Sequence, residues 1–271
     1  MAPHVSPIKY VDGVRFSMSD KPFPVLLTFD LDGEAAFEEI HPGVPYWVTQ
    51  GGYGPRKGVY RILDLLDENE IKATFCVVGL TAERYPEAVE EIVSRGHEVA
   101  CHGYTHRGYN DLKPEEEREG IIKGREILEE FYGRKIVGHR TPRWRPSGRT
   151  HRNLEELGFA WNSDYMGSEE CFYNVIDGRE SRLLEIPVAY NLDDWTFYYD
   201  WGSTVKDTVD TWTIEFDARY KDRSLFCLTC HPQVTGRPSR LLCLSGIVEY
   251  IQKFPDVEFM RATEYVERYW G

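Results

Sequence analysis

The chain lacks both features that direct a protein into or across a membrane. Its 271 residues contain no apolar run of 18 residues and no cationic, apolar segment at the start. A membrane-spanning helix needs about 20 mostly apolar residues, and a signal peptide needs a basic start followed by an apolar stretch. We therefore expect neither membrane spanning nor secretion by a signal peptide, and we predict a cytoplasmic protein.

Positive charge is also scarce. The chain has 32 Lys and Arg against 45 Asp and Glu, which gives a formal net charge of −13. An acidic surface repels the phosphates of nucleic acids and of anionic membranes, although acidity can also serve solubility alone. We therefore expect no nucleic acid and no membrane surface among the partners.

Cysteines are too few for a disulfide scaffold, with six in the whole chain. Cys76, Cys101 and Cys227 fall inside strand-like runs, where a thiol behaves as a small apolar side chain. We expect reduced thiols in the core. The string from Cys227 to His231 formally matches a c-type haem attachment site, but it lies in a strand-like run and no export signal is present.

The chain also lacks any Ser-, Gly- or Pro-rich linker that would divide it. Hydrophobic residues make up 41% of its 271 residues, enough for one large α/β domain with a substantial core. We predict that residues 21–271 form this single domain. Residues 1–20 have no periodic pattern, and we expect them to be an arm that packs on a neighbouring subunit or frays.

Strand-like and helical runs alternate along the chain, which predicts a parallel sheet with crossover helices. The predicted strands are 24–30, 73–78, 97–101, 135–137, 159–162, 183–189, 224–230 and 257–260. The predicted helices are 56–70, 83–95, 114–132, 149–157, 204–220 and 239–253. Seven or eight such units predict a barrel. The segment 163–182 is neither apolar nor periodic, and we expect a surface excursion there.

Two aspartates close the first of these strands. Residues 24–30 read PVLLTFD, whose apolar and β-branched side chains predict a strand buried on both faces. Because side chains alternate along an extended chain, Asp30 and Asp32 would point to the same side, where one could bind a cation and the other could handle protons. The alternative is a cap at Asp30 and a turn at Asp32-Gly33. Glu34 is a rival ligand or base.

A histidine pair follows the third predicted strand. His102 and His106 come directly after HEVAC, residues 97–101. Spacing of four residues lets two imidazoles meet one ion from consecutive turns of a helix, or from a short turn. With Asp32 they would complete a two-histidine, one-carboxylate set that leaves positions open for water and substrate. Alone, such a pair is more often two polar residues on an exposed helix face.

Three later strand-like runs also end in polar side chains. The sequence reads GHRTPRW at 138–144, NLDDW at 191–195 and LFCLTCHP at 225–232. In parallel barrels the active site lies at the carboxyl ends of the strands. Arg140, an Asp pair and His231 would all lie at such ends, and unrelated structural roles do not explain this shared position.

In this order the segments resemble the five motifs of the polysaccharide deacetylase superfamily, the NodB-homology carbohydrate esterases. TFDLDGE resembles motif one, HGYTH motif two, RTPRW motif three, DDW motif four and LTCHP motif five. The likeness spans residues 24–262. It implies an α/β fold, a distorted (β/α) barrel of seven or eight parallel strands, and a hydrolase of carbon–nitrogen bonds other than peptide bonds.

Two departures from the usual motifs leave the substrate open. The two aspartates are adjacent in the usual motif one but separated here by Leu31, and Gly103 stands where motif two usually has Ser or Thr. Together with GYGPRKGVYR at 52–61, they are similar to the intracellular branch of the superfamily. That branch includes allantoinase-like and cyclic-imide-hydrolysing proteins and a peptidoglycan-deacetylase-like group, and some of its members need no metal.

The resemblance, read with the residues, predicts amide hydrolysis by metal-activated water. Asp32, His102 and His106 would hold a divalent ion, with Zn²⁺ the first choice. Asp30, paired with Arg140, would accept the proton of the attacking water.

The leaving nitrogen needs a proton donor, and His231 is the candidate. Asp194, in preference to Asp193, would hold His231 in its cationic form. We interpret His97 and His139 as structural.

Aromatic residues are concentrated in two predicted loops. Residues 35–55 include Tyr46 and Trp47, and residues 195–201 read WTFYYDW. Aromatic faces can stack on sugar rings or flat amides, and the same residues can form a packing or subunit interface, so we expect a homo-oligomer. We predict three substrate-binding side chains: Tyr53, Trp144 and Trp195.

The first choice of reaction is N-deacetylation of a polysaccharide or peptidoglycan type, with an N-acetylated sugar as substrate. The alternative substrate is a small cyclic amide, imide or ureide. A large open groove would favour the polymer, and a closed pocket under residues 35–55 would favour the small ring. An inactive carbohydrate-binding relative is a third possibility, but a pure binding module needs neither a base such as Asp30 nor an acid such as His231.

Overall fold

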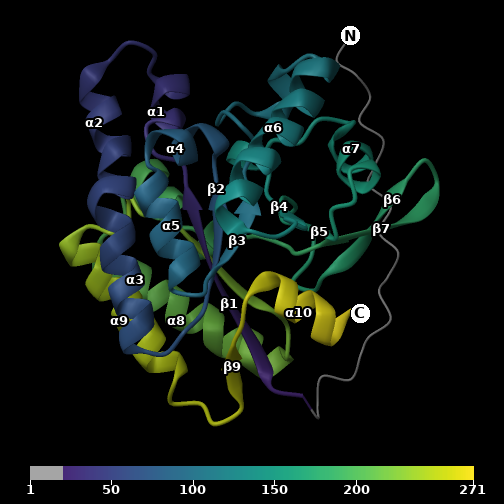
Figure 1. The fold of residues 1–271 in the computed structure, drawn as a ribbon. Helices are drawn as coiled ribbons and strands as arrows, with labels where there is room; N and C mark the ends of the chain where they lie inside the picture. Colours follow the sequence, from purple (N-terminus) through teal and green to yellow (C-terminus); the bar gives the residue numbers. More distant parts are fainter. Residues whose placement is uncertain (1–20) are drawn as a thin grey trace.

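A computed structural model describes residues 21–271, and one curled sheet runs through the whole of this part (Figure 1). The predicted arm at residues 1–20 lies outside the described residues. Nine strands occur within 21–271: β1 (Phe23–Leu31), β2 (Thr74–Val77), β3 (Glu98–Cys101), β4 (Gly138–His139), β5 (Trp161–Asn162), β6 (Phe172–Ile176), β7 (Arg179–Glu185), β8 (Phe226–Cys230) and β9 (Val257–Phe259).

Helices cover the outside of this sheet. The α-helices in the same part of the chain are α1 (Ala35–Ile40), α2 (Pro45–Tyr53), α3 (Val59–Glu68), α4 (Gly79–Arg84), α5 (Pro86–Ser94), α6 (Pro114–Tyr132), α7 (Thr150–Glu156), α8 (Val205–Asp222), α9 (Pro238–Ile251) and α10 (Ala262–Tyr269). None of the helices between residues 21 and 271 combines the length and apolar character that a membrane span requires.

The sheet confirms the predicted distorted barrel of parallel strands. Its order is β6-β7-β5-β4-β3-β2-β1-β8, with β9 beside the start of β1. Only β6 runs antiparallel to its neighbour among the described strands. The barrel stays open because no ladder within 21–271 joins β8 to β6. A single bridge between Asp193 and Thr229 ties the chain after β7 to β8.

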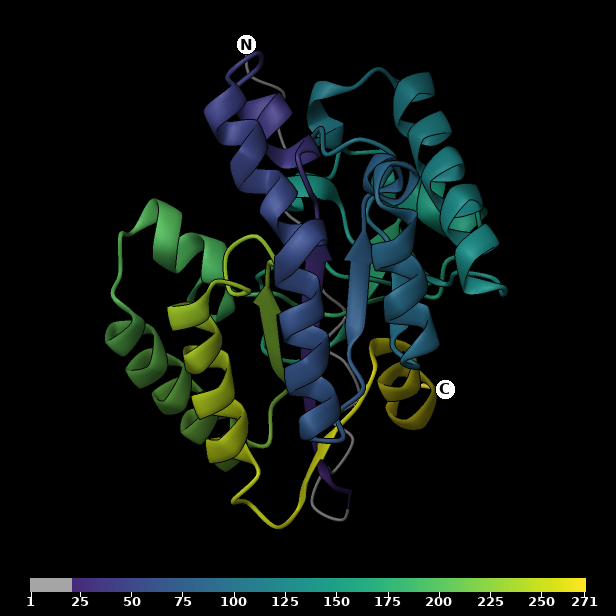
Figure 2. The ribbon, with the colours of Figure 1, turned by 60° about the vertical axis from the view of Figure 1, so that its left-hand side comes forward.

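The longest strand within 21–271 is β1, and all nine of its residues are buried. It pairs with β2 on one edge and β8 on the other, and α3 and α9 lie on the outside (Figure 2). This burial on both faces explains why residues 24–30 form a continuous apolar run without alternation. The two aspartates at its end are therefore placed by the most constrained strand of the fold.

Some element boundaries follow directly from local sequence signals. The predicted helix 114–132 is confirmed as α6, with Pro114 in its first turn and Gly133 in a left-handed conformation (φ 67°) at its end. The fourth strand is predicted at 135–137, but β4 is Gly138–His139. So short a strand has too few residues for periodicity to locate it.

The predicted loop 35–55 is wrong, because most of it is helical. Pro45 starts α2, which continues through a π-helical turn, Gly54–Gly58, directly into α3. Figure 2 shows these segments as one long helix in front of β1. Four glycines between residues 51 and 58 lowered the helix propensity of this segment, but packing against neighbouring loops keeps it helical. The predicted loop 195–201 likewise contains a π-helical turn, Thr196–Asp200.

The predicted surface excursion 163–182 is wrong in part, because residues 172–185 form the β6–β7 hairpin. Phe172–Ile176 alternates between buried and half-buried side chains. Asp177 (φ 53°) and Gly178 (φ 79°) both have positive φ, as a tight two-residue hairpin turn requires. The Asp-Gly pair was the signal that the apolar count missed.

Candidate active site

The carboxyl ends of the parallel strands open into a cavity of about 500 Å³. Sheet register brings the candidate residues together at this edge. The last pair of the β1–β8 ladder is followed on the two strands by Asp30 and His231, and the β3–β4 pair is followed by His102 and Arg140. Backbone pairing therefore fixes the relative positions of these four side chains.

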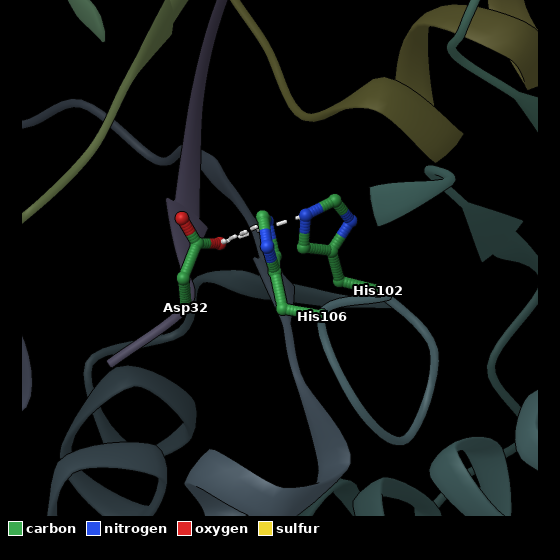
Figure 3. A group of neighbouring side chains, drawn as sticks. All are labelled: Asp32, His102 and His106. Atoms are coloured by element: carbon green, nitrogen blue, oxygen red, sulfur yellow. Dashed lines mark ion pairs between the residues drawn. The ribbon is translucent and has the colours of Figure 1, made fainter. Parts of the chain in front are cut away.

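Three side chains converge on one point (Figure 3). Oδ1 of Asp32 lies 3.5 Å from Nε2 of His102 and 3.6 Å from Nε2 of His106. All three side chains are buried. The histidines lie on an irregular turn after β3, where Gly103 has φ 71°, so the short-turn form of the four-residue spacing applies rather than the helical one.

Most of the other polar atoms of His102 and Asp32 have hydrogen-bond partners. Nδ1 of His102 donates to the carbonyl of Arg140 at 2.7 Å, which leaves its Nε2 lone pair facing Asp32. The Gln233 amide donates to Oδ2 of Asp32 at 3.0 Å, and the Thr81 hydroxyl donates to the Asp32 carbonyl at 2.6 Å. Oδ1 of Asp32 is buried and has no hydrogen-bond partner within residues 21–271. One carboxylate oxygen facing two imidazole nitrogens fits a divalent ion.

A second group of possible ligand atoms comprises Asp193, Asp194 and His231. Both carboxylate oxygens of Asp194 are occupied. Oδ1 accepts from Nδ1 of His231 at 2.6 Å, and Oδ2 accepts from the His231 backbone N–H at 2.9 Å and from the Thr235 hydroxyl at 2.5 Å. Asp194 therefore orients His231, and this group is a poorer fit to an ion than the first.

Asp30 is held by Arg140 on the floor of the cavity. The Arg140 guanidinium donates to Oδ1 of Asp30 at 2.6 Å and also to Thr28 and Ser163. Burial by itself raises the pKa of Asp30, but the charges of Arg140 and the nearby imidazoles outweigh it and hold this pKa below its ordinary value. Asp30 is therefore ionised at neutral pH and able to accept a proton.

His231 faces Asp30 and Asp32. Its Nε2 lies 4.0 Å from Oδ2 of Asp30 and 3.9 Å from Oδ2 of Asp32. Burial lowers the pKa of His231, but Asp194 and the other carboxylates outweigh burial and raise this pKa well above its ordinary value. His231 is thus a cationic imidazole that can donate a proton.

Asp193 is the neighbour that does not orient His231 directly. Its Oδ1 is 3.7 Å from Nδ1 of His231, and its Oδ2 accepts from both the backbone N–H and the hydroxyl of Thr196. Burial raises the pKa of Asp193 to about 7.

Aromatic rings form one side of the cavity. Trp195 lies against His231 with ring centroids 5.6 Å apart and against Phe37 at 5.3 Å, and Phe37 stacks on Trp47 at 5.6 Å. Trp144 also lines the cavity and has φ 50°, a conformation that is costly for a non-glycine residue and that often marks functional sites. Two of the three predicted substrate-binding residues, Trp144 and Trp195, line the cavity.

Tyr53, the third predicted substrate-binding residue, lies outside this cavity. It lies on the last turn of α2 and points toward the loop after β8, where its hydroxyl donates to the carbonyl of Gly236 at 3.0 Å and the Arg61 guanidinium contacts the same hydroxyl. The helix that replaces the predicted loop decides the direction of this side chain.

Glu34, the rival ligand or base, is engaged by side chains outside the cavity lining. Its Oε1 accepts a hydrogen bond from the Tyr85 hydroxyl and lies 3.5 Å from Arg56. It does not line the cavity. Because β1 ends at Leu31, the alternation that would have put Glu34 on the face of Asp32 no longer holds.

The two histidines interpreted as structural also lie outside the cavity lining. Nδ1 of His97 accepts from the Ala73 backbone N–H at 3.2 Å. His139 is bound between Tyr109 and Asn162 at 3.0 and 2.9 Å. Burial lowers the pKa of His97 to about 4 and that of His139 to about 3, so both are neutral.

Glycines let the helical stretch from Pro45 to Glu68 pack closely against two of the loops that follow strand ends. This close packing explains the glycines in the segment 52–61. A Cβ atom on Gly51 would lie 2.3 Å from the carbonyl oxygen of Gly33, and one on Gly58 would lie 1.9 Å from that of Pro232. Only glycine allows the helix this close to both backbones. The loops that follow Asp32 and His231 are thereby pressed against one helix.

Some residues in and behind the site were missed at the sequence level. Gln233, two residues after His231, donates to Asp32 and could have been suspected from its position after the strand end. Arg143, Arg145 and Tyr190 also line the cavity; Arg143 lies within RTPRW, but nothing in the sequence pointed to its side chain, and no pattern distinguishes the other two from surface residues.

The fold and the site together define a hydrolase that carries a metal-type ligand set opposite an acid–base pair. The sequence model of the family described as "Polysaccharide deacetylase" matches residues 19–161, more than half of the chain. A peptidoglycan deacetylase of Helicobacter pylori is 27% identical over 269 residues, which covers 87% of this chain and 92% of the relative.

Solved structures share the fold. A putative polysaccharide deacetylase from Mycobacterium smegmatis has a TM-score of 0.87 at 32% identity, covering 96% of this chain and 94% of that one. Puue allantoinase has a TM-score of 0.82 at 22% identity, with 91% of each chain covered, and at that identity it shows the fold alone.

The chain belongs to the polysaccharide deacetylase family. It is a hydrolase that acts on carbon–nitrogen bonds other than peptide bonds.

Proposed function

We propose that the protein is a divalent-metal-dependent N-deacetylase that removes the acetyl group from an N-acetylated sugar of a polysaccharide or peptidoglycan type. One observation carries the proposal: Asp32, His102 and His106 aim three ligand atoms at one point, beside Asp30 and His231. The family and the relatives named as deacetylases supply the substrate class.

Asp32, His102 and His106 would hold the ion. Their nitrogen and oxygen donors suit Zn²⁺, and the unpartnered Oδ1 of Asp32 is the atom that most needs a cation. When bound, a divalent ion of this kind polarises the substrate carbonyl and lowers the pKa of a bound water.

Asp30 acts as the general base. Its carboxylate is ionised because Arg140 pairs with Oδ1, and the second oxygen, Oδ2, faces the cavity side shared with His102 and His231. It would take the proton from the water that attacks the acetyl carbonyl. General bases placed in this way contribute about 10²- to 10⁴-fold to the rate.

His231 acts as the general acid on the opposite side. Asp194 holds Nδ1, so Nε2 carries the proton that faces the cavity. It would protonate the nitrogen as the carbon–nitrogen bond breaks, leaving a free amine on the sugar and releasing acetate. Trp144 and Trp195 would pack on the sugar and acetyl group.

A small cyclic amide or ureide is the second candidate substrate. The observation in its favour is that residues 35–53 fold over the site as α1 and α2, so that Phe37 and Trp47 line the cavity. A cavity of about 500 Å³ accepts either a small ring or a single sugar unit with its neighbour.

We also propose a cytoplasmic homo-oligomer. Tyr46, Tyr190 and Trp201 are more than half exposed. Tyr190 lines the cavity, Tyr46 lies on α2, and Trp201 directly follows the π-helical turn Thr196–Asp200. Light scattering of the purified protein tests the oligomeric state, and a monomer at all concentrations would contradict this part.

One assay separates the substrates. Purified protein is incubated with N-acetylglucosamine oligomers, peptidoglycan fragments, a cyclic imide and allantoin, each with and without chelator. The proposal predicts acetate from the N-acetylated sugars, lost with chelator and restored by Zn²⁺. Ring opening without acetate would favour the second candidate, and full activity in chelator-treated, metal-free protein would overturn the metal assignment.

A further inference from the structure

Glu39 lies beside the candidate metal ligands and has no part in the function proposed above. It is on α1, and its side chain is 18% exposed. Oε1 accepts from the Arg143 guanidinium at 3.2 Å. Oε2 lies 3.8 Å from Nδ1 of His106. One carboxylate thus reaches both the turn after β3 and the turn after β4.

The two facing atoms are both without a hydrogen-bond partner. Oε2 of Glu39 and Nδ1 of His106 are each buried, and neither has a partner in the part of the chain that the structure describes. Unpartnered buried polar atoms are unfavourable. The gap between them exceeds a normal hydrogen bond by about 1 Å, which a small rotation of either side chain closes.

His102, the other histidine of the candidate metal site, has the hydrogen bond at Nδ1 that His106 lacks. Nδ1 of His102 donates to the Arg140 carbonyl, so its Nε2 lone pair is fixed toward Asp32. Metal-binding histidines usually donate their second ring N–H to a carboxylate, carbonyl or water, which fixes the tautomer and the ring. Glu39 is the carboxylate that lies in position to do this for His106.

We propose that Glu39 is a positioning residue for the metal site, accepting a hydrogen bond from Nδ1–H of His106 and turning its Nε2 lone pair toward Asp32. The inference rests on the metal set of the proposed function. Glu39 lies on α1, the helix that also carries the cavity-lining Phe37. Its hydrogen bond would therefore connect α1 to His106, a candidate ligand that follows β3.

Arg143 keeps this carboxylate in place from the other side. Its backbone is left-handed (φ 61°), which is strained for arginine, and its side chain reaches back to Glu39. The neighbouring Glu38 pairs instead with Arg84, which lies 3.0 Å from each of its oxygens. Adjacent glutamates on one short helix therefore make comparable ion pairs, but only Glu39 faces a candidate ligand.

Glu38 thus offers a matched control for the test. We would titrate Zn²⁺ into chelator-stripped protein by calorimetry for wild type, Glu39→Ala, Glu39→Gln and Glu38→Ala. Loss of a carboxylate behind a ligating histidine weakens metal binding by about 10- to 100-fold, which is the effect expected for Glu39→Ala. Glu39→Gln keeps an oxygen acceptor and should retain most of the affinity, and Glu38→Ala should bind as wild type does.

A second readout uses the metal-free protein. Long-range ¹H–¹⁵N NMR of labelled histidine reports which ring nitrogen of His106 carries hydrogen. Wild type should carry it on Nδ1, and Glu39→Ala should lose this preference.

The outcomes separate this inference from the proposed function. If wild-type protein bound no Zn²⁺, the metal assignment would be wrong. The NMR result would still show whether Glu39 accepts a hydrogen bond from Nδ1–H of His106. Equal Zn²⁺ affinity of Glu39→Ala and Glu38→Ala would overturn the role of Glu39. If Glu39→Ala does not fold, a wild-type His106 bearing hydrogen only on Nε2 would overturn it as well.

Discussion

The floor and the wall of the cavity are built in different ways. The floor comprises Asp30, Asp32, His102, His106 and His231, which are buried and lie at or just after strand ends. The wall comprises α1, α2 and the π-helical turn Thr196–Asp200, whose aromatic side chains stack mainly on one another. Sheet register fixes the floor, whereas packing between short helices fixes the wall. We therefore expect separable parts of the chain to carry the chemistry and the choice of substrate.

The largest effect should come from the floor. Asp30→Asn removes the proton acceptor but keeps the shape of the side chain, so kcat should fall by at least about 10²- to 10⁴-fold. Metal content, measured by mass spectrometry, should stay unchanged because Asp30 is not in the ligand set. Loss of metal together with activity would reverse the roles of Asp30 and Asp32 and break the division between base and ligand.

A substitution behind the floor should act through backbone packing. A Cβ at Gly58 would lie 1.9 Å from the Pro232 carbonyl oxygen, so Gly58→Ala must push the helix away from the loop that carries Gln233. We expect a loss of about 1–3 kcal/mol in the free energy of unfolding, typical of overpacking, and a lower kcat.

Gly120→Ala is the control for Gly58→Ala. Gly120 lies in α6, and a Cβ added there would have no neighbouring atom within 4 Å, so the same change should stabilise the helix by about 0.5–1 kcal/mol. Chemical denaturation measures both variants. An equally stable Gly58→Ala protein would show that the close approach is not needed.

A change in the wall should affect binding more than the chemical step. Trp47→Ala removes ring contacts with Phe37 and His41. Trp47 also lines the cavity, and an aromatic contact with the substrate would contribute about 0.5–1.5 kcal/mol, which corresponds to a rise in KM of about 2- to 10-fold with little change in kcat. Steady-state kinetics on the best substrate checks this. A fall in kcat as large as that of Asp30→Asn would contradict the separation of floor and wall.

The smallest effect on activity should come from an aromatic residue of α2 that does not line the cavity. Tyr53→Phe loses the hydrogen bond to the Gly236 carbonyl, at a cost of about 0.5–1.5 kcal/mol in stability. Activity should stay close to wild type because Tyr53 does not line the cavity. A rise in KM comparable to that of Trp47→Ala would restore Tyr53 as a substrate-binding residue.

The floor was the easier region to predict from sequence. Buried parallel strands leave long apolar runs, and a charged residue at the end of such a run, like Asp30 or His231, stands out. Alternation along the strand correctly gives a common face for Asp30 and Asp32, but it fails at Glu34, where the extended chain has ended.

The wall was harder because its elements are decided by tertiary contacts. Gly51, Gly52 and Gly54 suggested a loop before residue 56, yet glycines such as Gly51 let the helix approach the neighbouring backbone. Without the helix, the direction of Tyr53 could not be known. The different partners of the two aspartates, His231 for Asp194 and Thr196 for Asp193, are tertiary contacts that no local pattern encodes.

The most direct test is the position of a bound ion. Anomalous diffraction at the zinc edge from a zinc-soaked crystal should give one strong peak at about 2.0–2.2 Å from Oδ1 of Asp32 and Nε2 of His102 and His106. A peak among Asp193, Asp194 and His231, or no peak at either group, would contradict the account.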